Sequence, residues 1–120
     1  MLPNDNTPDG LLRALSDRLG LDYEPQDWGL INADGNRLDE FVACFVDWGL
    51  EDTQRFELAE LILASANDRL LLGLSLDLQL LIGLAEREKA AFDHHIEYWL
   101  GLFADKEFPL SDVLRTFMPR

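Results

Sequence analysis

Cysteine is almost absent from this sequence. Its 120 residues include a single thiol, that of Cys44, so no disulfide can form within the chain. Apolar residues flank Cys44, which predicts a buried thiol, because free cysteines are among the most buried residues in proteins. A nucleophilic cysteine would need a nearby base, and His94 and His95 lie some fifty positions further along the chain. We therefore expect a structural role for Cys44.

Long apolar runs are also missing. Glycine or polar residues interrupt the most leucine-rich stretch, residues 70–84, at five positions, which argues against a membrane-spanning helix. The first ten residues contain two prolines and no basic residue, so they do not resemble a secretory signal. With eight arginines and only two lysines, the composition suits a bacterial protein. We expect a cytoplasmic bacterial protein without membrane contacts.

Positive charge is scarce, since 10 lysines and arginines face 23 aspartates and glutamates, for a net charge of −13. Such a chain repels nucleic acid and anionic membranes, and it attracts basic proteins. Between residues 22 and 60, eleven acids and two arginines leave a local net charge of −9. The acidity also fits a need for solubility alone. From this stretch we predict an acidic partner surface of nine residues: Asp22, Glu24, Asp27, Asp39, Glu40, Glu51, Asp52, Glu57 and Glu60.

Three segments show the signals of amphipathic helices. The first begins at Thr7-Pro8-Asp9, a hydroxyl cap followed by proline and an acid, and ends at Gly20. The second covers residues 52–66, with Asp52 as its cap, and the third covers residues 89–104. Pro109 then interrupts the chain, and residues 111–112 predict a short final turn. The second helix places five side chains on one inward stripe: Phe56, Ala59, Ile62, Leu63 and Ala66.

Alternating patterns predict strands between these helices. Every even position from 70 to 84 is apolar, but only two of the seven odd positions are, which is typical of strands. Residues 28–31 form a short apolar run before Asp34-Gly35, which predicts a strand and a turn. Residues 37–50 fit either a buried strand or a short helix.

The sequence thus predicts an α+β fold in which three main helices pack on a small antiparallel sheet. We expect a flexible tail over residues 1–8 and a single globular domain over residues 9–120. The alternative is an all-α helical bundle. It is favoured by the count of valine, isoleucine and threonine, which together number only ten, and by the preference of leucine for helices.

No motif in the sequence indicates catalysis, a metal or a cofactor. His94 and His95 are adjacent, so on a helix their side chains point about 100° apart, whereas helical metal sites use residues three or four positions apart. Asn32, Asp34 and Asn36 are spaced like the first three ligands of a calcium loop. The sixth position of that loop should be glycine and is Arg37, and the twelfth should be glutamate and is Ala43. Glu57 and Glu60 lie one turn apart without a catalytic motif, which favours a solvated helix face. We expect a protein that is not an enzyme and holds neither cofactor nor metal.

The order of these segments resembles that of the class I type III secretion chaperones, which are small acidic bacterial proteins of similar length. Residues 11–21 (LLRALSDRLGL) are similar to the opening helix of that family, and residues 29–35 (GLINADG) to its first strand and turn. Residues 57–67 (ELAELILASAN) are similar to the second helix, residues 72–86 to the following strands, and residues 89–104 to the final helix.

The resemblance implies a homodimer formed through a central helix, here residues 52–66, with the stripe from Phe56 to Ala66 at the contact. It also implies a virulence-associated chaperone that holds an extended segment of a secreted effector on apolar patches. The acidic stretch supports an alternative, an immunity protein or inhibitor that neutralises a basic bacterial toxin. Both hypotheses describe a non-catalytic protein whose partner is another protein.

Overall fold

The computed structural model describes residues 7–102 and 107–118, and within these ranges all regular structure is helical. The helices are α1 (Pro8–Leu19), α2 (Trp28–Ile31), the 3-10 helix η1 (Gly35–Arg37), α3 (Leu38–Asp47), α4 (Asp52–Leu71), α5 (Leu78–Arg87), α6 (Lys89–Leu100) and α7 (Pro109–Phe117). The small antiparallel sheet of the α+β prediction is therefore wrong for the described residues. The alternative of an all-α bundle fits this structure.

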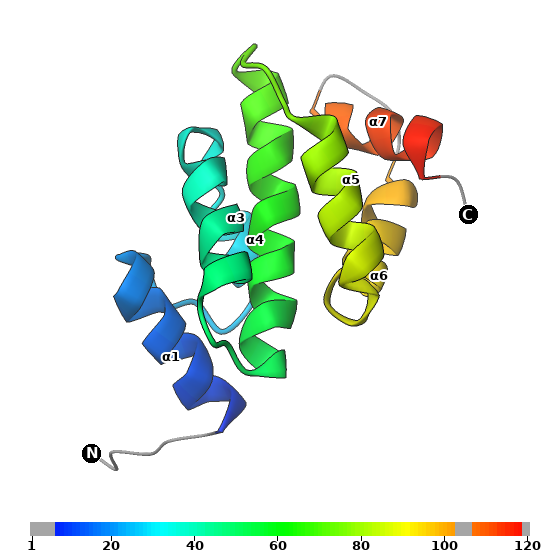
Figure 1. Cartoon of the computed structure of the whole chain (residues 1–120). Coiled ribbons are helices and arrows are strands. Elements are labelled where there is room, and N and C mark those ends of the chain that lie inside the picture. The colour runs from blue at the N-terminus through cyan, green and yellow to red at the C-terminus, as the bar shows by residue number, and fades with distance from the viewer. Residues whose placement is uncertain (1–6, 103–106, 119–120) are drawn as a thin grey trace.

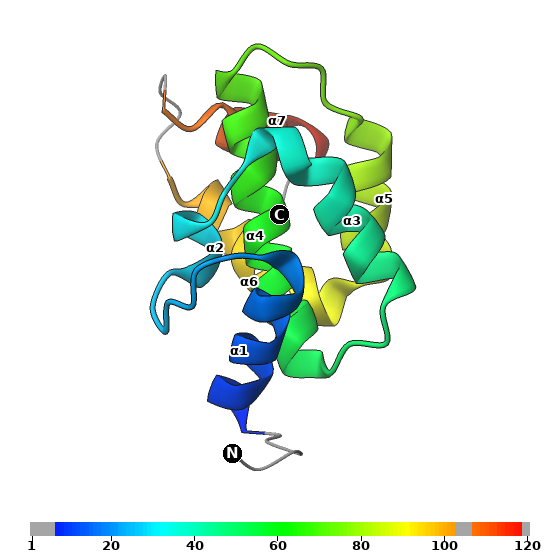
Figure 2. The same ribbon diagram turned by 90° about the vertical axis from the view of Figure 1, so that its left-hand side faces the viewer.

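Helix α4 forms the centre of the molecule, and the other helices pack around it. Figures 1 and 2 show α3 and α5 on one side of α4, and α2 with α6 on the other side. At the start of α4, the side-chain amide of Gln54 donates to the carbonyl oxygen of Leu11 in α1 at 3.0 Å. Near its end, the Asn67 side chain accepts a hydrogen bond from the backbone N–H of Leu110 in α7 at 3.0 Å. Helix α4 thus holds both ends of the described chain in one core.

Helix α1 begins and ends where its sequence signals predict. The hydroxyl of Thr7 accepts a hydrogen bond from the backbone N–H of Gly10 at 3.1 Å, and Pro8 lies in the first turn. Gly20 ends the helix with a φ of 66°, a conformation that glycine adopts without steric strain. These signals involve only neighbouring residues, which is why the sequence reveals them.

The strands predicted over residues 70–84 are instead the end of α4, a loop and most of α5. Helix α4 runs to Leu71, five residues beyond its predicted end. Helix α5 begins after Asp77, whose carboxylate accepts a hydrogen bond from the N–H of Leu80 at 3.1 Å. The alternation was misleading because this leucine-rich stretch also contains a helical period, with Leu81, Leu84 and Ala85 as the buried residues of α5. Leucine is a better helix former than strand former, and the helical period prevails.

Residues 28–31 are also helical, where the sequence predicted a strand. They form the single turn α2, which Trp28 anchors in the core: its indole N–H donates to the hydroxyl of Ser16 at 2.8 Å. The predicted Asp-Gly turn opens η1, and the carboxylate of Asp34 accepts a hydrogen bond from the N–H of Asn36 at 3.0 Å. A tertiary contact of one large side chain therefore decides the conformation of this short apolar run.

Of the two structures left open for residues 37–50, the short helix is correct. Helix α3 buries one side of its surface, and its buried residues are Leu38, Phe41, Val42, Cys44 and Phe45. The cap of the following helix differs from the prediction, because Glu51 rather than Asp52 forms it, in a reciprocal capping box with Gln54.

The C-terminal part follows the prediction less closely. Helix α6 begins at Lys89 as predicted and ends at Leu100, and residues 103–104 of the predicted helix lie outside the described residues. Pro109 begins a nine-residue helix, α7, where only a short turn was expected, because proline is well accepted in the first helical turn. Among the described residues, no helix is long and apolar enough to span a bilayer.

Candidate functional site

Three segments that are distant in sequence meet on the side of α4 that carries α2 and α6 (Figure 2). The approach of α2 depends on Gly29, because a Cβ atom there would lie 2.6 Å from the backbone nitrogen of Leu61 in α4. Helix α6 reaches the same side through His95, whose Nε2 lies 2.8 Å from the carbonyl oxygen of Phe56. The loop before α2, the middle of α4 and the middle of α6 thus become neighbours.

A pocket of about 160 Å³ lies where these segments meet, and we call it the acidic pocket. No lysine or arginine among the described residues lines it. It combines carboxylates with the half-exposed ring of Tyr98 and the apolar side chain of Leu30. Its lining residues are Asp27, Leu30, Glu60, His94, His95, Tyr98 and Trp99.

Glu60 connects the three segments at this pocket. Its Oε1 accepts a hydrogen bond from the N–H of Gly29 at 2.8 Å, and its Oε2 lies 3.9 Å from Nδ1 of His95. Burial raises the pKa of Glu60 and the charge of Asp27 adds to it, while the N–H groups of Gly29 and Leu30 and the charge of His94 partly oppose the rise. Burial also raises the pKa of Glu57, and repulsion from Glu60 contributes further. A cation brought to this pocket would favour the ionised form of both glutamates.

His95 does not supply that cation at neutral pH. Because the Phe56 carbonyl can only accept, Nε2 of His95 carries the proton, and Nδ1 is unprotonated in the neutral ring. Burial lowers the pKa of His95, the Phe56 carbonyl partly opposes this, and the charge of His94 lowers it further. The ring that faces Glu60 is therefore neutral near pH 7.

The three segments that build this side contain neither lysine nor arginine, and their histidines are His94 and His95. Residues 19–36, 56–68 and 90–102 include nine acids and neither lysine nor arginine. Within the described ranges, Asp27 and the two glutamates of α4 form no ion pair with a lysine or arginine. Within the described chain, the negative charge of the acidic pocket thus has no lysine or arginine counter-ion, and the basic group that acts on Glu60 is His94.

Asp27 also has an unusual backbone. Its φ of 56° and ψ of 32° place it in the left-handed region, and no other non-glycine residue of the described chain has a positive φ. This conformation is uncommon for residues with a Cβ atom, and strained residues cluster at functional sites. The left-handed conformation of Asp27 turns the chain into α2 beside the acidic pocket.

The nine residues of the predicted acidic surface are divided between different parts of the fold. Asp27 and Glu60 line the acidic pocket, and Glu57 lies one helical turn before Glu60 and is repelled by it. Glu40, in contrast, forms an ion pair with Arg37 at 2.6 Å beside α3. The exposed members are Asp22, Asp27, Asp39, Glu40, Glu51 and Asp52, and the half-buried members are Glu24, Glu57 and Glu60.

The stripe predicted as a dimer contact lies inside the chain. Ala59, Ile62, Leu63 and Ala66 are buried in the hydrophobic core, and Phe56 is half-buried with its ring centroid 4.3 Å from that of His95. These side chains pack against helices of the same chain and leave no area for a second copy. A homodimer would need another surface, and the oligomeric state stays a prediction.

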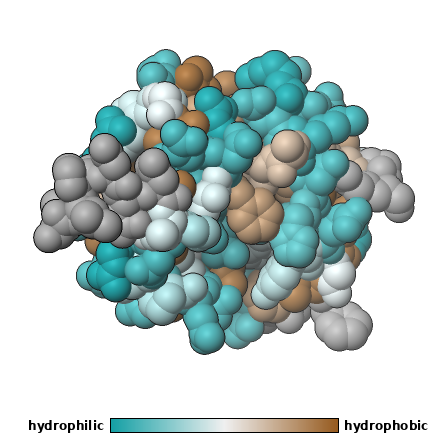
Figure 3. Space-filling view, turned by 90° about the horizontal axis from the view of Figure 1, so that it is seen from below, coloured by the Kyte–Doolittle hydropathy of each residue, from teal (hydrophilic) through white to brown (hydrophobic). Residues whose placement is uncertain are grey.

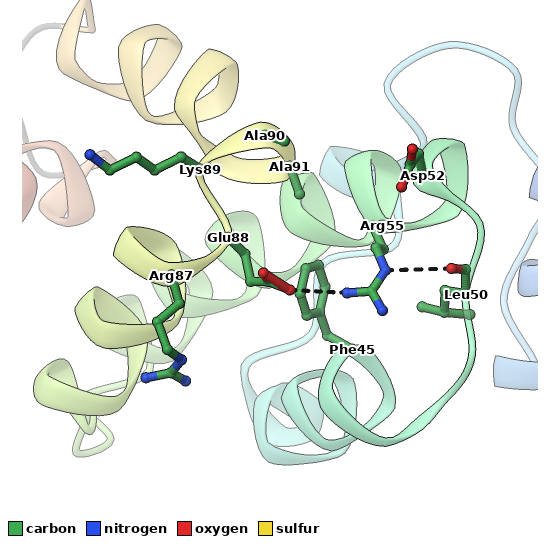
Figure 4. Close-up of a pocket in the computed structure, with 9 residues that line it drawn as sticks. All are labelled: Phe45, Leu50, Asp52, Arg55, Arg87, Glu88, Lys89, Ala90 and Ala91. Carbon is green, nitrogen blue, oxygen red and sulfur yellow. Dashed lines mark hydrogen bonds and ion pairs between the residues drawn. The ribbon is translucent and has the colours of Figure 1, made fainter.

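The side of α4 opposite the acidic pocket carries a seam between α3 and α5, with a pocket near each end. The larger pocket, of about 610 Å³, lies at the turn between α5 and α6 (Figure 4). In it, the guanidinium of Arg55 donates to the carboxylate of Glu88 at 3.0 Å and to the carbonyl of Leu50 at 3.4 Å. The smaller pocket, of about 260 Å³, is lined by Leu38, Asp39, Val42, Arg69, Ser75, Leu76, Asp77, Leu80 and Leu81.

The surface at the end where α4 begins is mostly hydrophilic, with a small apolar area near its centre (Figure 3).

The thiol of Cys44 is buried, as predicted, and burial raises its pKa to about 11, so it is protonated at neutral pH. Among the described residues, no three histidine, cysteine, aspartate or glutamate side chains are placed to hold a metal ion. The described chain thus offers no thiolate nucleophile at Cys44.

Comparisons with protein-family models, with characterised proteins and with solved structures found no match to this chain. The candidate site therefore depends on the geometry of the chain itself. Sequence reasoning named Asp27, Glu57 and Glu60 but considered His95 only with His94 as a metal pair. The signal it missed is the lack of lysine and arginine from three separate segments, and only the fold shows that these segments meet.

Proposed function

We propose that this protein binds a cationic protein and that the acidic pocket receives a lysine or arginine side chain of this partner. The observation that carries the proposal is the meeting of three segments that lack lysine and arginine around carboxyl groups with raised pKa values. A basic side chain from a partner would supply the missing counter-ion, and the exposed ring of Tyr98 is available for a cation–π contact.

This proposal develops the hypothesis of an immunity protein or inhibitor that neutralises a basic bacterial toxin in the cytoplasm. The net charge of −13 speeds the encounter with a cationic partner, and the acidic pocket then selects one basic side chain. The proposed activity is binding, without catalysis.

The chaperone hypothesis has lost part of its basis, because segments similar to the family's strands are helices and loops here. Residues 29–35 span α2 and the start of η1, and residues 72–86 span a loop and most of α5. What remains of that hypothesis is the exposed apolar surface between α3 and α5.

An NMR titration of the whole chain tests the proposal. The ligands are a short peptide with alternating glycine and arginine, and the same peptide with neutral citrulline in place of arginine. We expect the arginine peptide to shift the amide signals of Gly29, Glu60 and Tyr98, and the citrulline peptide to leave them in place. Binding should weaken as the pH falls towards the raised pKa values of Glu57 and Glu60, because protonation removes the negative charge that holds the cation.

Two double variants with the same change of charge distinguish a site from general attraction. Asp27→Asn with Glu57→Gln removes two acids near the pocket, and we expect about tenfold weaker binding of the arginine peptide. Asp47→Asn with Glu86→Gln removes two exposed acids from α3 and α5, and should change the affinity by less than about twofold. Equal weakening in both variants, with shifts scattered over the whole surface, would mean that the chain is only a diffuse polyanion.

A further inference from the structure

Helices α3 and α5 lie on the side of α4 opposite α2 and α6 (Figures 1 and 2), and both carry exposed apolar side chains. Val46 on α3 is 59% exposed and Leu80 on α5 is 45% exposed. Val46 lies one helical turn beyond Val42, and Val42 and Leu80 line the smaller pocket together with Leu38, Leu76 and Leu81. Apolar side chains that share a surface mark interaction sites more often than single exposed ones.

The smaller pocket makes one end of this seam acidic. Asp39 of α3 and Asp77, at the start of α5, are both exposed there. The basic residue in this pocket, Arg69, is engaged within the chain, because its guanidinium donates to the backbone carbonyls of Gly35 and Ser75. Two carboxylates thus lie at this end, one at each side of the seam: Asp39, and Asp77, one oxygen of which also caps α5.

The larger pocket makes the other end basic by one charge, because Arg55, Arg87 and Lys89 line it together with Asp52 and Glu88. Arg87 and Lys89 are exposed, and neither forms an ion pair with another described residue. Figure 4 shows both extending from the α5–α6 turn, away from the paired side chains of Arg55 and Glu88. The two ends of one apolar seam therefore carry opposite charge, although the whole chain is strongly acidic.

We propose that this seam is a docking site for an amphipathic helix of a protein partner, with an acidic residue of that helix at Arg87 and Lys89 and a basic residue at Asp39 and Asp77. The apolar face of the helix packs on Val46 and Leu80. This site lies on the opposite side of α4 from the acidic pocket and does not depend on the function proposed there.

The direction of the docked helix follows from helix dipoles. Acidic residues stabilise the N-terminus of a helix and basic residues its C-terminus, so the helix starts at the basic end of the seam. It then runs antiparallel to α3 and α5, which both run from the acidic end to the basic end. Each of these helices has 10 residues and is about 15 Å long at 1.5 Å per residue, so a partner segment of about three turns covers the seam.

Two synthetic peptides of equal composition test the proposal by fluorescence polarisation. Both place leucines on one helical face; one has glutamates at its N-terminal end and lysines at its C-terminal end, and the other has these charges exchanged. We expect the first peptide to bind the natural chain about tenfold more tightly. The double variant Asp39→Lys with Lys89→Glu should prefer the second peptide, which excludes a difference in peptide helicity as the cause.

Exposed apolar residues provide the second test. The double variant Val46→Gln with Leu80→Gln should bind the first peptide at least tenfold more weakly. The variant Ile31→Gln, at an exposed position on α2, should bind it with unchanged affinity. The proposal would be overturned if the double variant and Ile31→Gln lost equal affinity for the first peptide. It would also be overturned if the charge-exchanged variant still preferred the first peptide, or if neither peptide bound. A dimer in light scattering that Val46→Gln with Leu80→Gln converts to a monomer would also overturn it, because a second copy would then occupy the seam.

Discussion

Glu60 has a structural role and an unfavourable electrostatic environment at the same time. The N–H of Gly29 donates to its carboxylate and ties α2 to α4. Asp27 and Glu57 repel the carboxylate, the charge of His94 offsets part of this, and His95 stays neutral. Like charges close together reduce stability, so the folded chain keeps a destabilised arrangement at this pocket. Conflicts of this kind, in which one local preference is violated, are typical of functional sites.

Replacing Glu57 by glutamine should therefore stabilise the protein at neutral pH by about 0.2–0.5 kcal/mol, the usual size of a like-charge pair on a helix. Because the pKa of Glu57 is raised in the folded state, its ionisation opposes folding once the pH exceeds the ordinary value of 4.5. The gain should disappear at lower pH, where the carboxyl is protonated in both folded and unfolded chains. Urea unfolding at pH 7 and at about pH 4 measures both values.

Glu40→Gln is the matched control, with the opposite sign. Its hydrogen bond with Arg37 lowers the pKa of Glu40, so this carboxylate stabilises the fold above its ordinary pKa of 4.5, and the effect is lost as the pH falls through the lowered value. The variant should be less stable than the natural chain at pH 7. A stabilised Glu40→Gln protein, or a Glu57→Gln gain that persists in acid, would show that charge is not the cause.

At the scale of elements, the short helices depend on close contact with α4. The N–H of Gly35 donates to the carboxylate of Asp68 at 2.7 Å, and the guanidinium of Arg69 donates to the carbonyl of Gly35 at 3.0 Å. A Cβ atom on Gly35 would lie 2.5 Å from the backbone nitrogen of Arg69, so the two segments can meet only at a glycine. Helix η1 is thus placed by backbone contact rather than by its own helical preference.

Gly35→Ala should destabilise the protein by about 3 kcal/mol, because the backbone of α4 cannot move away from the added methyl group without disturbing the core. Gly49→Ala is the control, since a Cβ atom there meets nothing within 4 Å and its φ is not positive. Its unfolding free energy should stay within about 0.5 kcal/mol of the natural value. Equal stability of the two variants in urea unfolding would contradict the close contact of η1 with α4.

At the scale of the whole molecule, α4 separates two surfaces of different character. The α2–α6 side gathers acids without lysine or arginine, and the α3–α5 side exposes apolar residues between ends of opposite charge. Because other helices cover α4 on both sides, these two surfaces are formed by the neighbours of α4. The two proposed partners would therefore bind on opposite sides of α4, one by charge and the other mainly by apolar contact.

Sodium chloride should affect folding and partner binding in opposite directions. Repulsion among 23 acids outweighs the few ion pairs seen in the described chain, so screening by about 0.5 M salt should raise the thermal midpoint. The same salt should slow association with a cationic partner. Calorimetry and stopped-flow mixing at two salt concentrations measure both effects, and a lower thermal midpoint in salt would contradict this account.

The sequence by itself determined what depends on composition or on near neighbours. The caps of α1, the helical centre of α4, the start of α6 and the buried thiol of Cys44 follow from residues within a few positions of one another. The excess of acids is likewise a property of the chain alone.

Only the tertiary structure decided between strand and helix where local patterns supported both. Residues 70–84 carry a strand period and a helical period together, and packing around α4 selects the helical one. The tertiary structure also decided which residues share a site, because Asp27, Glu60 and His95 come together only through Gly29 and the packing of α6. Contacts between distant residues depend on how whole elements pack, and the spacing of residues along the chain does not contain that information.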